Sequence, residues 1–329
     1  MNSPNPAFCS RQTTTTGRLA PSPTGGLHIG NARTFLFAWL VVRHSGGRLI
    51  FRMEDLDATR ARAEAAAAAI EDLHWLGLTW DEGPDCGGPT LPYVQSERGP
   101  IYRNALEELI AKELVYPCTC TRADVARAAS APHAGEGTGT YPGTCSNLTA
   151  TEGLEMEAQG KAFAWRFRTA GKVVNWHDMV RGPKRHDLAM TGGDFIVARA
   201  GGIYSYQLAV VIDDGLMGVN QVVRGHDLVE STPRQILLQE ALGLPRPEYW
   251  HLGLVLDGSG KRMAKRDQAV KISSLREAGT DPANLRSTLM KGLGWDAMQW
   301  DALGQIEFCG AIKEWKKYNL NLESDWVWS

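Results

Sequence analysis

The chain has 329 residues, more than one average domain, so two or three structural units are expected. Hydrophobic residues make up 43% and charged residues 22%, a composition typical of a soluble globular protein that excludes extensive disorder. The formal net charge of −2 gives no overall basic field that would indicate a nucleic-acid partner, although a local basic face is compatible with it. No apolar run is long enough to span a bilayer and the N-terminus lacks an apolar signal core, so we expect a cytoplasmic protein without a membrane partner.

The first elements predict an α/β fold. Residues 1–17 have no periodicity and are expected to form a flexible tail. Residues 17–20 predict a short strand, 31–47 a helix ended by two glycines, and 48–55 a second strand. Strand, glycine loop, helix and strand are typical of the first unit of a doubly wound parallel sheet. In such a sheet, ligands bind at the carboxyl ends of strands and at helix N-termini.

The middle of the chain changes character twice. After two predicted helices, residues 60–78 and 100–115, residues 116–160 lose periodicity and become rich in Gly, Thr, Pro and Cys. That composition is typical of a small insertion stabilised by something other than a large core. Residues 204–225 are rich in β-branched and aromatic residues, which favours strands. A helix is expected over residues 231–244, with Thr232 as its N-cap.

A glycine-rich loop precedes the first helix. The segment "RLAPSPTGGLHIGNARTF", residues 18–35, is neither a dinucleotide fingerprint nor a Walker A loop, because no Lys-Ser/Thr follows its last glycine. Gly25, Gly26 and Gly30 would let a nucleotide approach the backbone, and the helix N-terminus favours phosphate. His28 would then donate to phosphate oxygens during displacement at phosphorus. A turn with an exposed histidine fits the spacing equally well.

A second candidate phosphate-binding segment is "KRMAKR", residues 261–266, which alone is usually a solvated loop. Together the two segments resemble the paired signatures of class I aminoacyl-tRNA synthetases, with His28–Asn31 at the HIGH signature and Arg262–Arg266 at the KMSKS signature. The segments "FRMEDLDATR", "DLHWLGLTWDEGP", "YSYQLAVVIDD" and "VVRGHDL" resemble the glutamyl branch of that class. The resemblance covers residue 18 to about residue 295.

The resemblance implies a Rossmann-like catalytic domain that activates glutamate with ATP and Mg²⁺. The product would be glutamyl-adenylate, with release of pyrophosphate, and glutamate would then pass to a tRNA. Glutamate carries two carboxylates and one ammonium, so its pocket needs guanidinium groups and a carboxylate. By resemblance, Arg18 and Arg224 would bind carboxylate, Glu54 the ammonium, and Tyr206 would orient the substrate. Taken singly, these residues would be read as a surface arginine, a capping or salt-bridged glutamate, and a core tyrosine.

The residues that the resemblance places at each ligand form two sets. The glutamate set is Arg18, Leu19, Ala20, Pro21, Ser22, Glu54, Tyr206 and Arg224. The ATP set is Gly26, His28, Gly30, Asn31, Arg262, Met263 and Lys265, with His28 and Lys265 as catalytic residues.

Three positions depart from the family signatures. Ala264 replaces a serine and removes one hydroxyl that could bond ATP, and Arg262 replaces a lysine. Asn31 replaces the second histidine of the first signature, which leaves His28 as the stronger catalytic candidate. Lys265 is retained, so stabilisation of phosphate charge can survive.

Three of the six cysteines cluster in the predicted insertion, as Cys118-x-Cys120 followed by Tyr141-x-x-x-Cys145. Three thiolates suit Zn²⁺, which requires a fourth ligand for its tetrahedron. His133 is the first chemical candidate, whereas the resemblance to the zinc insertion of some glutamyl-type enzymes favours Tyr141. The zinc would be structural. Three reduced cysteines without metal are the alternative.

The architecture is shorter than that of a complete glutamyl-tRNA synthetase, because too little chain follows Lys265 for a helical anticodon-binding region. This resembles the glutamyl-Q tRNA(Asp) synthetases, which activate glutamate without tRNA and attach it to queuosine at the wobble position of tRNA(Asp). The expected partners are L-glutamate, ATP and queuosine-bearing tRNA(Asp), and the protein is expected to be a monomer. One alternative is a truncated glutamyl-tRNA synthetase that charges tRNA(Glu). The other is a catalytically inactive, zinc-containing RNA-binding module, which the retained His28, Lys265 and Glu54 disfavour.

The fold expected is therefore α/β, a Rossmann-like doubly wound parallel sheet with a small zinc-binding insertion and a short C-terminal helical stem-contact region. The expected segments are a flexible tail (1–17), the first half of the catalytic domain (18–100), the insertion with the zinc site (101–190), the second half of the catalytic domain (191–243), the KMSKS-like loop and stem-contact region (244–295) and a tail of unknown role (296–329).

Overall fold

A computed structural model describes residues 14–57, 63–121, 123–125, 141–257, 270–294 and 322–328. The predictions made for residues 1–13, for His133 and for Arg262, Met263 and Lys265 lie outside these residues. Within the described ranges, none of the helices combines the length and the apolar character needed to cross a bilayer.

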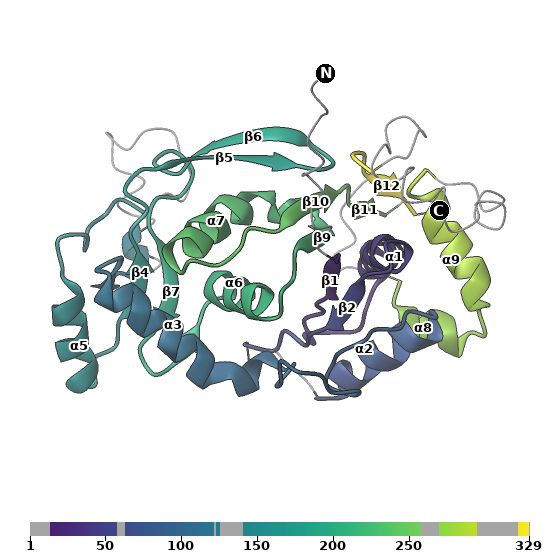
Figure 1. Cartoon of the computed structure of the whole chain (residues 1–329), viewed down its shortest axis with the longest axis horizontal. Helices are drawn as coiled ribbons and strands as arrows, with labels where there is room; N and C mark the ends of the chain where they lie inside the picture. The colour runs from purple at the N-terminus through teal and green to yellow at the C-terminus, as the bar shows by residue number, and fades with distance from the viewer. Residues whose placement is uncertain are drawn as a thin grey trace, which may run out of the picture.

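Parallel strands form the centre of the molecule (Figure 1). Three parallel pairings join the first strand to the second, the ninth to the tenth, and the tenth to the end of the fifth. The first and ninth strands meet at Asn220, whose backbone N–H donates to Thr16 O over 3.0 Å. In spatial order the strands are β2 (Arg48–Phe51), β1 (Thr16–Leu19), β9 (Gln221–Gly225), β10 (Glu248–Leu252) and β5 (Val173–Asp178). The predicted α/β fold with a parallel sheet is confirmed.

Helices flank this sheet (Figure 1). Helix α1 (Ile29–His44) packs against β1, β2 and β9 through a largely apolar surface that includes the fully buried Phe37 and Val42. It ends where Gly46 adopts a positive φ of 64°, which glycine allows without strain. The other described helices are α2 (Ala63–Trp75), α3 (Gly99–Ala111), α5 (Ala150–Ala158), α6 (Tyr206–Leu216), α7 (Thr232–Ala241), α8 (Ile272–Glu277) and α9 (Pro282–Lys291), with short 3-10 turns at Gln95–Arg98 and His226–Ser231.

Three local predictions differ from the structure. Strand β1 begins at Thr16, so the last residues of the expected flexible tail 1–17 belong to the sheet. Residues 204–225 are not strand throughout, because α6 begins at Tyr206. Its N-cap is Ser205, whose hydroxyl accepts the N–H of Leu208. Helix α7 is preceded by Ser231, so Thr232 is its first residue and not its N-cap.

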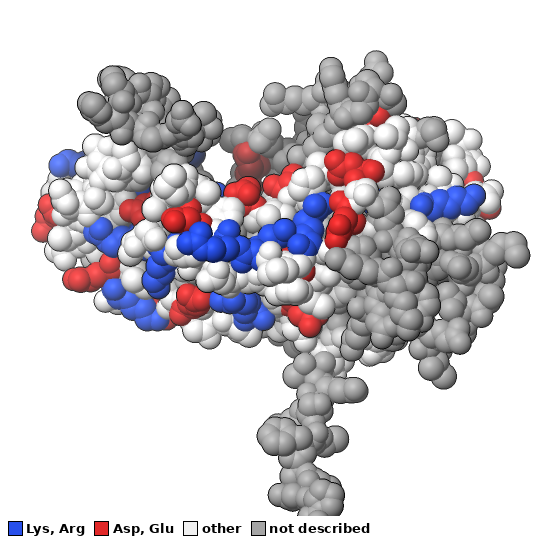
Figure 2. Space-filling view, turned by 90° about the horizontal axis from the view of Figure 1, so that it is seen from above, with Lys and Arg blue, Asp and Glu red and all other residues white. Residues whose placement is uncertain are grey.

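A separate antiparallel sheet consists of β3 (Val115–Cys118), β4 (Ala164–Phe167), β7 (Phe195–Arg199) and β8 (Ile203–Tyr204). Only β3 and β4 belong to the predicted insertion 101–190, whereas β7 and β8 lie in the segment 191–243 that was expected to belong to the catalytic domain. Strand β6 (Gly182–Asp187) pairs antiparallel with β5, and the two form a hairpin at the top of the view in Figure 1. Seen from above, on the side of the molecule where this hairpin lies, Lys and Arg side chains form a band (Figure 2). Strand β6 itself contains Lys184, which is half-buried, and Arg185, which is exposed.

Part of the C-terminal tail of unknown role pairs with the segment 244–295, the predicted KMSKS-like loop and stem-contact region. Strand β12 (Trp326–Val327) lies parallel to β11 (Val255–Leu256), and Gly253 N donates to Leu322 O over 2.8 Å. The ring of Trp326 lies against Gly292 so closely that a Cβ there would approach it to 2.5 Å. The described end of the tail therefore covers α9 and the strand that follows β10.

A buried carboxyl on α2 should make stability depend on pH. Asp72 is fully buried, and burial raises its pKa from 3.8 to about 6, opposed by Arg276 on α8. The folded state therefore holds the proton more tightly than the unfolded chain, and this stabilising contribution is lost as the pH rises from about 4 through 6. Between pH 4 and 7, the free energy of unfolding of Asp72→Asn should rise relative to wild type by about 1–3 kcal/mol. Urea unfolding at both pH values measures this difference.

The control is Glu71→Gln, because Glu71 also contacts Arg276 but is 64% exposed. Its stability difference from wild type should change little over the same pH interval. An equal change in both variants would assign the effect to the Arg276 contact instead of the buried carboxyl.

Candidate active site

A pocket of about 370 Å³ opens at the carboxyl ends of β1 and β9, beside the N-terminus of α1. It brings together residues that are far apart in the sequence, from Arg18 to Arg224. The predicted residues that line it are Arg18, Ala20, Pro21, Ser22, Gly26, His28, Gly30, Asn31, Glu54, Tyr206 and Arg224. Leu19 is the exception among the described candidates, because its side chain is fully buried in the core and does not line the pocket.

His28 is the N-cap of α1 and lines the pocket at the same time. Its imidazole Nδ1 accepts the backbone N–H of Gly30 over 3.1 Å, and the backbone N–H of His28 donates to Asn31 Oδ1 over 3.3 Å. A neutral imidazole that accepts at Nδ1 carries its proton on Nε2. Gly30 is needed for this arrangement, because a Cβ there would lie 2.9 Å from His28 Cε1. His28 can therefore cap the helix through one nitrogen and donate through the other.

The loop before α1 is hydrogen-bonded to the segment that follows residues 258–269. Ile29 N donates to Val270 O over 3.2 Å, and Ile272 N donates to Leu27 O over 2.9 Å. Between these two hydrogen bonds, the backbones of His28 and Lys271 pair as an isolated antiparallel β-bridge. Residues 270–272, which follow the second signature segment in the sequence, therefore lie directly beside the first signature segment.

A network of buried charges connects Arg18 and Glu54, which line the pocket, to residues that do not line it. Arg52 is fully buried and contacts Glu54 Oε1 at 2.9 Å and Asp214 Oδ1 at 2.8 Å. Arg18 Nε lies 3.5 Å from the same Asp214 oxygen, and its Nη1 donates to Val223 O over 3.1 Å. Burial alone lowers the pKa of Arg52, but Asp214, Glu54 and Asp213 together raise it well above its ordinary value. Each buried charge is thus paired, as burial of ionised groups requires.

The pKa values of Glu54 and Tyr206 are both raised. The side chain of Glu54 is 8% exposed, and its burial raises its pKa although Arg52 and Arg18 lower it. Burial likewise raises the pKa of the Tyr206 hydroxyl, opposed by Arg224. Tyr206 therefore stays a neutral donor at neutral pH, whereas at Glu54 the two arginines oppose the effect of burial without reversing it, so its pKa is raised.

Arg224 projects from β9 into the same pocket. Its Nε donates to His251 Nε2 and its Nη2 to Thr232 Oγ1, both over 2.9 Å. Nη1 is buried and has no hydrogen-bond partner among the described residues. The guanidinium is thus fixed by neutral groups on one side, with a donor left over for a ligand.

Arg52, Asp213 and Asp214 were not singled out from the sequence. Both segments that contain them, "FRMEDLDATR" and "YSYQLAVVIDD", were noted only for their family resemblance. A charged residue inside an otherwise apolar strand or helix was the available signal, because such a residue needs a buried partner. Asp213 receives hydrogen bonds from Gln95 and Tyr102 as well as from Arg98 at 2.6 Å, which connects α6 to α3 and to the 3-10 turn before α3.

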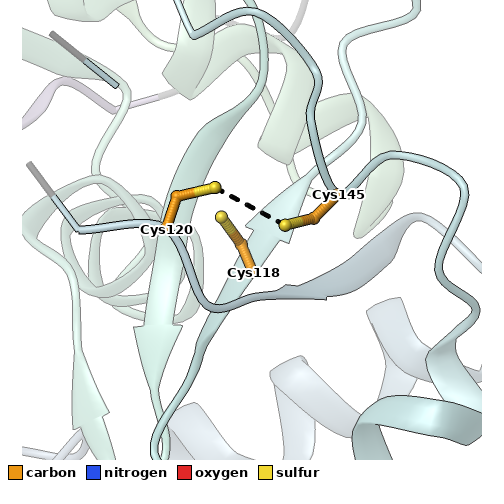
Figure 3. Close-up of side chains that lie close together, drawn as sticks. All are labelled: Cys118, Cys120 and Cys145. Carbon is orange, nitrogen blue, oxygen red and sulfur yellow. Dashed lines mark hydrogen bonds between the residues drawn. The ribbon is translucent and has the colours of Figure 1, made fainter. Parts of the chain in front are cut away.

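The cysteine cluster lies apart from the pocket, in the insertion. The Sγ atoms of Cys118, Cys120 and Cys145 all lie within 4.8 Å of one another and point toward a common centre (Figure 3). The hydroxyl of Tyr141 is 3.4 Å from Cys118 Sγ and accepts the N–H of Cys145 over 2.9 Å. Its ring is covered by the guanidinium of Arg166, 3.6 Å away. Four potential ligands from two chain segments therefore converge.

The parallel sheet, the pocket at its carboxyl edge and the histidine at the start of α1 define an α/β nucleotide-binding enzyme of the class I synthetase type. Residues 14–329 match the catalytic domain of the class I tRNA synthetases (E and Q), and the chain belongs to that family.

Relatives with known names agree with this assignment. The chain is 53% identical over 267 residues to the glutamyl-Q tRNA(Asp) synthetase of Symbiobacterium thermophilum, covering 81% of this chain and 82% of the relative. It is 50% identical to the glutamyl-Q tRNA(Asp) synthetase of Nitratidesulfovibrio vulgaris, covering 83% and 84%. The crystal structure of a glutamate tRNA ligase from Elizabethkingia meningosepticum, solved with its amino acid, superposes with a TM-score of 0.79 at 27% identity, covering 95% of this chain and 67% of that one.

Proposed function

We propose that the protein activates glutamate with ATP and then transfers it to queuosine in tRNA(Asp). The observation that carries this proposal is the pocket itself, in which two arginines, one carboxylate and a helix N-terminus converge. The greater likeness to two glutamyl-Q tRNA(Asp) synthetases, at 53% and 50% identity, supports the choice of acceptor. The enzyme would act as a cytoplasmic monomer on a Rossmann-like, doubly wound sheet, with residues 244–295 contacting the tRNA stem.

The pocket supplies a distinct partner for each charge of glutamate. Glu54 would bind the ammonium, and Arg18 and Arg224 the carboxylates, with Tyr206 donating its hydroxyl. The α-carboxylate oxygen would attack the α-phosphorus of ATP, forming the acyl–phosphate bond while the bond to pyrophosphate breaks. Negative charge then grows on the phosphate oxygens, where the Nε2–H of His28 and the N-terminus of α1 would stabilise it. Mg²⁺ would accompany the ATP phosphates, and Lys265 would act on them from the second signature.

Two experiments test the proposal. Purified protein should exchange ATP with labelled pyrophosphate when glutamate is added and tRNA is absent. Labelled glutamate should then transfer to bulk tRNA that contains queuosine but not to tRNA without it, and nuclease mapping should find the label at the wobble position. Label at the 3′ end of tRNA(Glu), with exchange that requires this tRNA, would support a truncated glutamate–tRNA ligase instead. Absence of both activities would favour a binding module.

The band of Lys and Arg on the side of the molecule where the β5–β6 hairpin lies supports a polyanionic partner (Figure 2). The chain as a whole carries a formal charge of −2, and Asp and Glu side chains flank the band in the same view (Figure 2), so the basic surface is a narrow strip. Phosphate contacts by such a face supply affinity without sequence specificity. We therefore place the tRNA backbone against this face.

We also infer that the cysteine cluster binds one structural zinc ion. Zn–S bonds of about 2.3 Å in a tetrahedron place sulfur atoms about 3.8 Å apart. The Cys120 and Cys145 Sγ atoms are 3.6 Å apart. Tyr141 is proposed as the fourth ligand, because its hydroxyl lies beside Cys118 Sγ. The cluster belongs to a small core of its own, whose local folding the metal would stabilise.

Metal analysis checks this inference. Purified protein should contain about one zinc ion per chain by mass spectrometry, and Cys118→Ser should lose it and become sensitive to proteolysis in residues 116–160. Cys86→Ser is the matched control, because Cys86 is an exposed free cysteine outside the cluster. Zinc retained by Tyr141→Phe would exclude Tyr141 as a ligand, and substoichiometric zinc in wild type would contradict the site.

A further inference from the structure

Behind Arg224 lies a row of buried polar side chains that the proposed reaction does not itself use. Asp178, His251 and Thr232 each have no exposed surface. They come from β5, β10 and the start of α7. Strand β10 pairs with β9, and β5 pairs with the other edge of β10. His251 and Arg224 are direct partners in the parallel pairing of β10 and β9, so their side chains share one face of the sheet.

Hydrogen bonds connect these side chains into a chain that ends at the pocket. His251 Nδ1 lies 2.5 Å from Asp178 Oδ2, and His251 Nε2 accepts from Arg224 Nε over 2.9 Å. A guanidinium nitrogen only donates, so His251 must accept at Nε2 and carry its proton on Nδ1, facing Asp178. The carboxylate of Asp178 therefore selects the tautomer that can hold Arg224.

The orientation of Asp178 is set by the backbone. Its Oδ1 accepts the N–H groups of Val180 over 3.0 Å and Arg181 over 2.8 Å. Because Oδ1 accepts both of these N–H groups, Oδ2 is the oxygen that accepts from the imidazole. Both contacts lie in the turn directly after β5, so the fold of that turn determines which oxygen faces His251.

The row holds Arg224 without neutralising its charge. Burial lowers the pKa of His251 to about 4, although Asp178 opposes this shift, so the ring is neutral at neutral pH. Arg18 and Arg52 both lie within 4.0 Å of carboxylate oxygens. Arg224, by contrast, contacts no carboxylate among the described residues, and its Nη1 has no protein partner there. Its buried positive charge is left for a ligand.

We propose that Asp178 and His251 are positioning residues that fix the guanidinium of Arg224 for the side-chain carboxylate of glutamate, and so determine selection of glutamate over glutamine. This inference rests on the proposed function. A neutral acceptor on Nε orients the planar donor group, while the full charge remains to favour an anionic side chain over a neutral amide.

Asp178→Asn tests the tautomer directly. The two backbone N–H groups would keep the amide oxygen at the Oδ1 position, so the amide NH₂ would face His251. The imidazole would then accept this NH₂ at Nδ1 and carry its own proton on Nε2. Two N–H groups, those of His251 Nε2 and Arg224 Nε, would then face each other, and the hydrogen bond between them would be lost. In glutamate-dependent pyrophosphate exchange, KM for glutamate should rise about 10- to 100-fold, because a hydrogen bond to a charged group is lost. KM for ATP should stay within about twofold, and the preference for glutamate over glutamine should fall.

Asp194→Asn is the matched control. Asp194 also accepts a backbone N–H on Oδ1, from Thr169, and a side-chain donor on Oδ2, from Tyr116, but it directly precedes β7 in the separate antiparallel sheet and does not line the pocket. It should leave both KM values and the amino-acid preference unchanged. A second measurement uses only the wild-type protein and so does not depend on whether a variant folds. The nitrogen NMR chemical shifts of the His251 ring should show a protonated Nδ1 and an unprotonated Nε2 at pH 7.

The outcomes separate this inference from the proposed function. Exchange by wild type with unchanged KM and preference in Asp178→Asn would overturn the positioning role alone. The opposite tautomer, or a doubly protonated ring, in the wild-type NMR spectrum would overturn it as well. No glutamate-dependent exchange by wild type would overturn the proposed function and this inference with it.

Discussion

His28→Asn should lower the rate of glutamate-dependent pyrophosphate exchange by about 10²- to 10³-fold, the usual effect of removing one donor to developing charge. The free energy of unfolding should stay close to wild type. Asparagine is a favourable N-cap, so its side-chain oxygen can accept the Gly30 N–H that His28 Nδ1 accepts. The substitution therefore removes the Nε2 donor and keeps the cap. Exchange kinetics and urea unfolding on the same preparation measure both effects.

His28→Ala completes this comparison. It should lose the same activity and, in addition, about 1 kcal/mol of stability, because the cap of α1 is lost as well. Near-normal exchange in His28→Asn, with reduced exchange only in the alanine variant, would mean that His28 acts through the helix and not on the substrate.

Arg224→Lys should raise KM for glutamate by about 100-fold although the charge is preserved. The guanidinium uses Nε and Nη2 for His251 and Thr232 and retains Nη1 for a ligand. A single ammonium has one nitrogen and cannot bond His251, Thr232 and a carboxylate in the same fixed directions. Exchange rates with glutamate, glutamine and aspartate should show both weaker use of glutamate and poorer discrimination.

Arg181→Lys serves as the control for this substitution. Arg181 also bonds the backbone of His251, through its Nε, but it donates to Glu323 O on the other side and does not line the pocket. Its replacement should leave KM for glutamate near the wild-type value. If Arg224→Lys discriminates as well as wild type and runs as fast, the side-chain subsite lies elsewhere in the pocket.

The strand and helix order around the glycine loop could be predicted, because the loop, the apolar helix that follows and the next strand are contiguous in the sequence. Helix α6 could not, because its β-branched residues favour a strand by propensity. Residues Leu208 through Asp214 are all buried, so packing against α3 and α7 overrides that propensity. Thr232 was predicted as a cap from its position before a proline. In the structure its hydroxyl bonds Arg224 instead.

The part of the site that lies in local sequence motifs could be predicted from the sequence. Arg18, Glu54, Tyr206 and Arg224 stand in recognisable segments, and the structure gathers them in one pocket. Their partners depend on which strands are neighbours and in what register, which no local pattern encodes. The pairing of His251 with Arg224 across β9 and β10 is such a case. The roles of Arg262, Met263 and Lys265 remain predictions.

The burial of the pocket charges has a consequence for ionic strength. Arg18, Arg52 and Arg224 are each at most 5% exposed, and mobile salt ions screen such charges much less than exposed ones. The Lys and Arg side chains of the band in Figure 2 face solvent, and in the proposed docking of tRNA added salt would compete there with RNA phosphates. Raising the salt concentration should therefore suppress transfer to tRNA well before it weakens glutamate activation. The two halves of the reaction could then be separated in one protein without changing a residue.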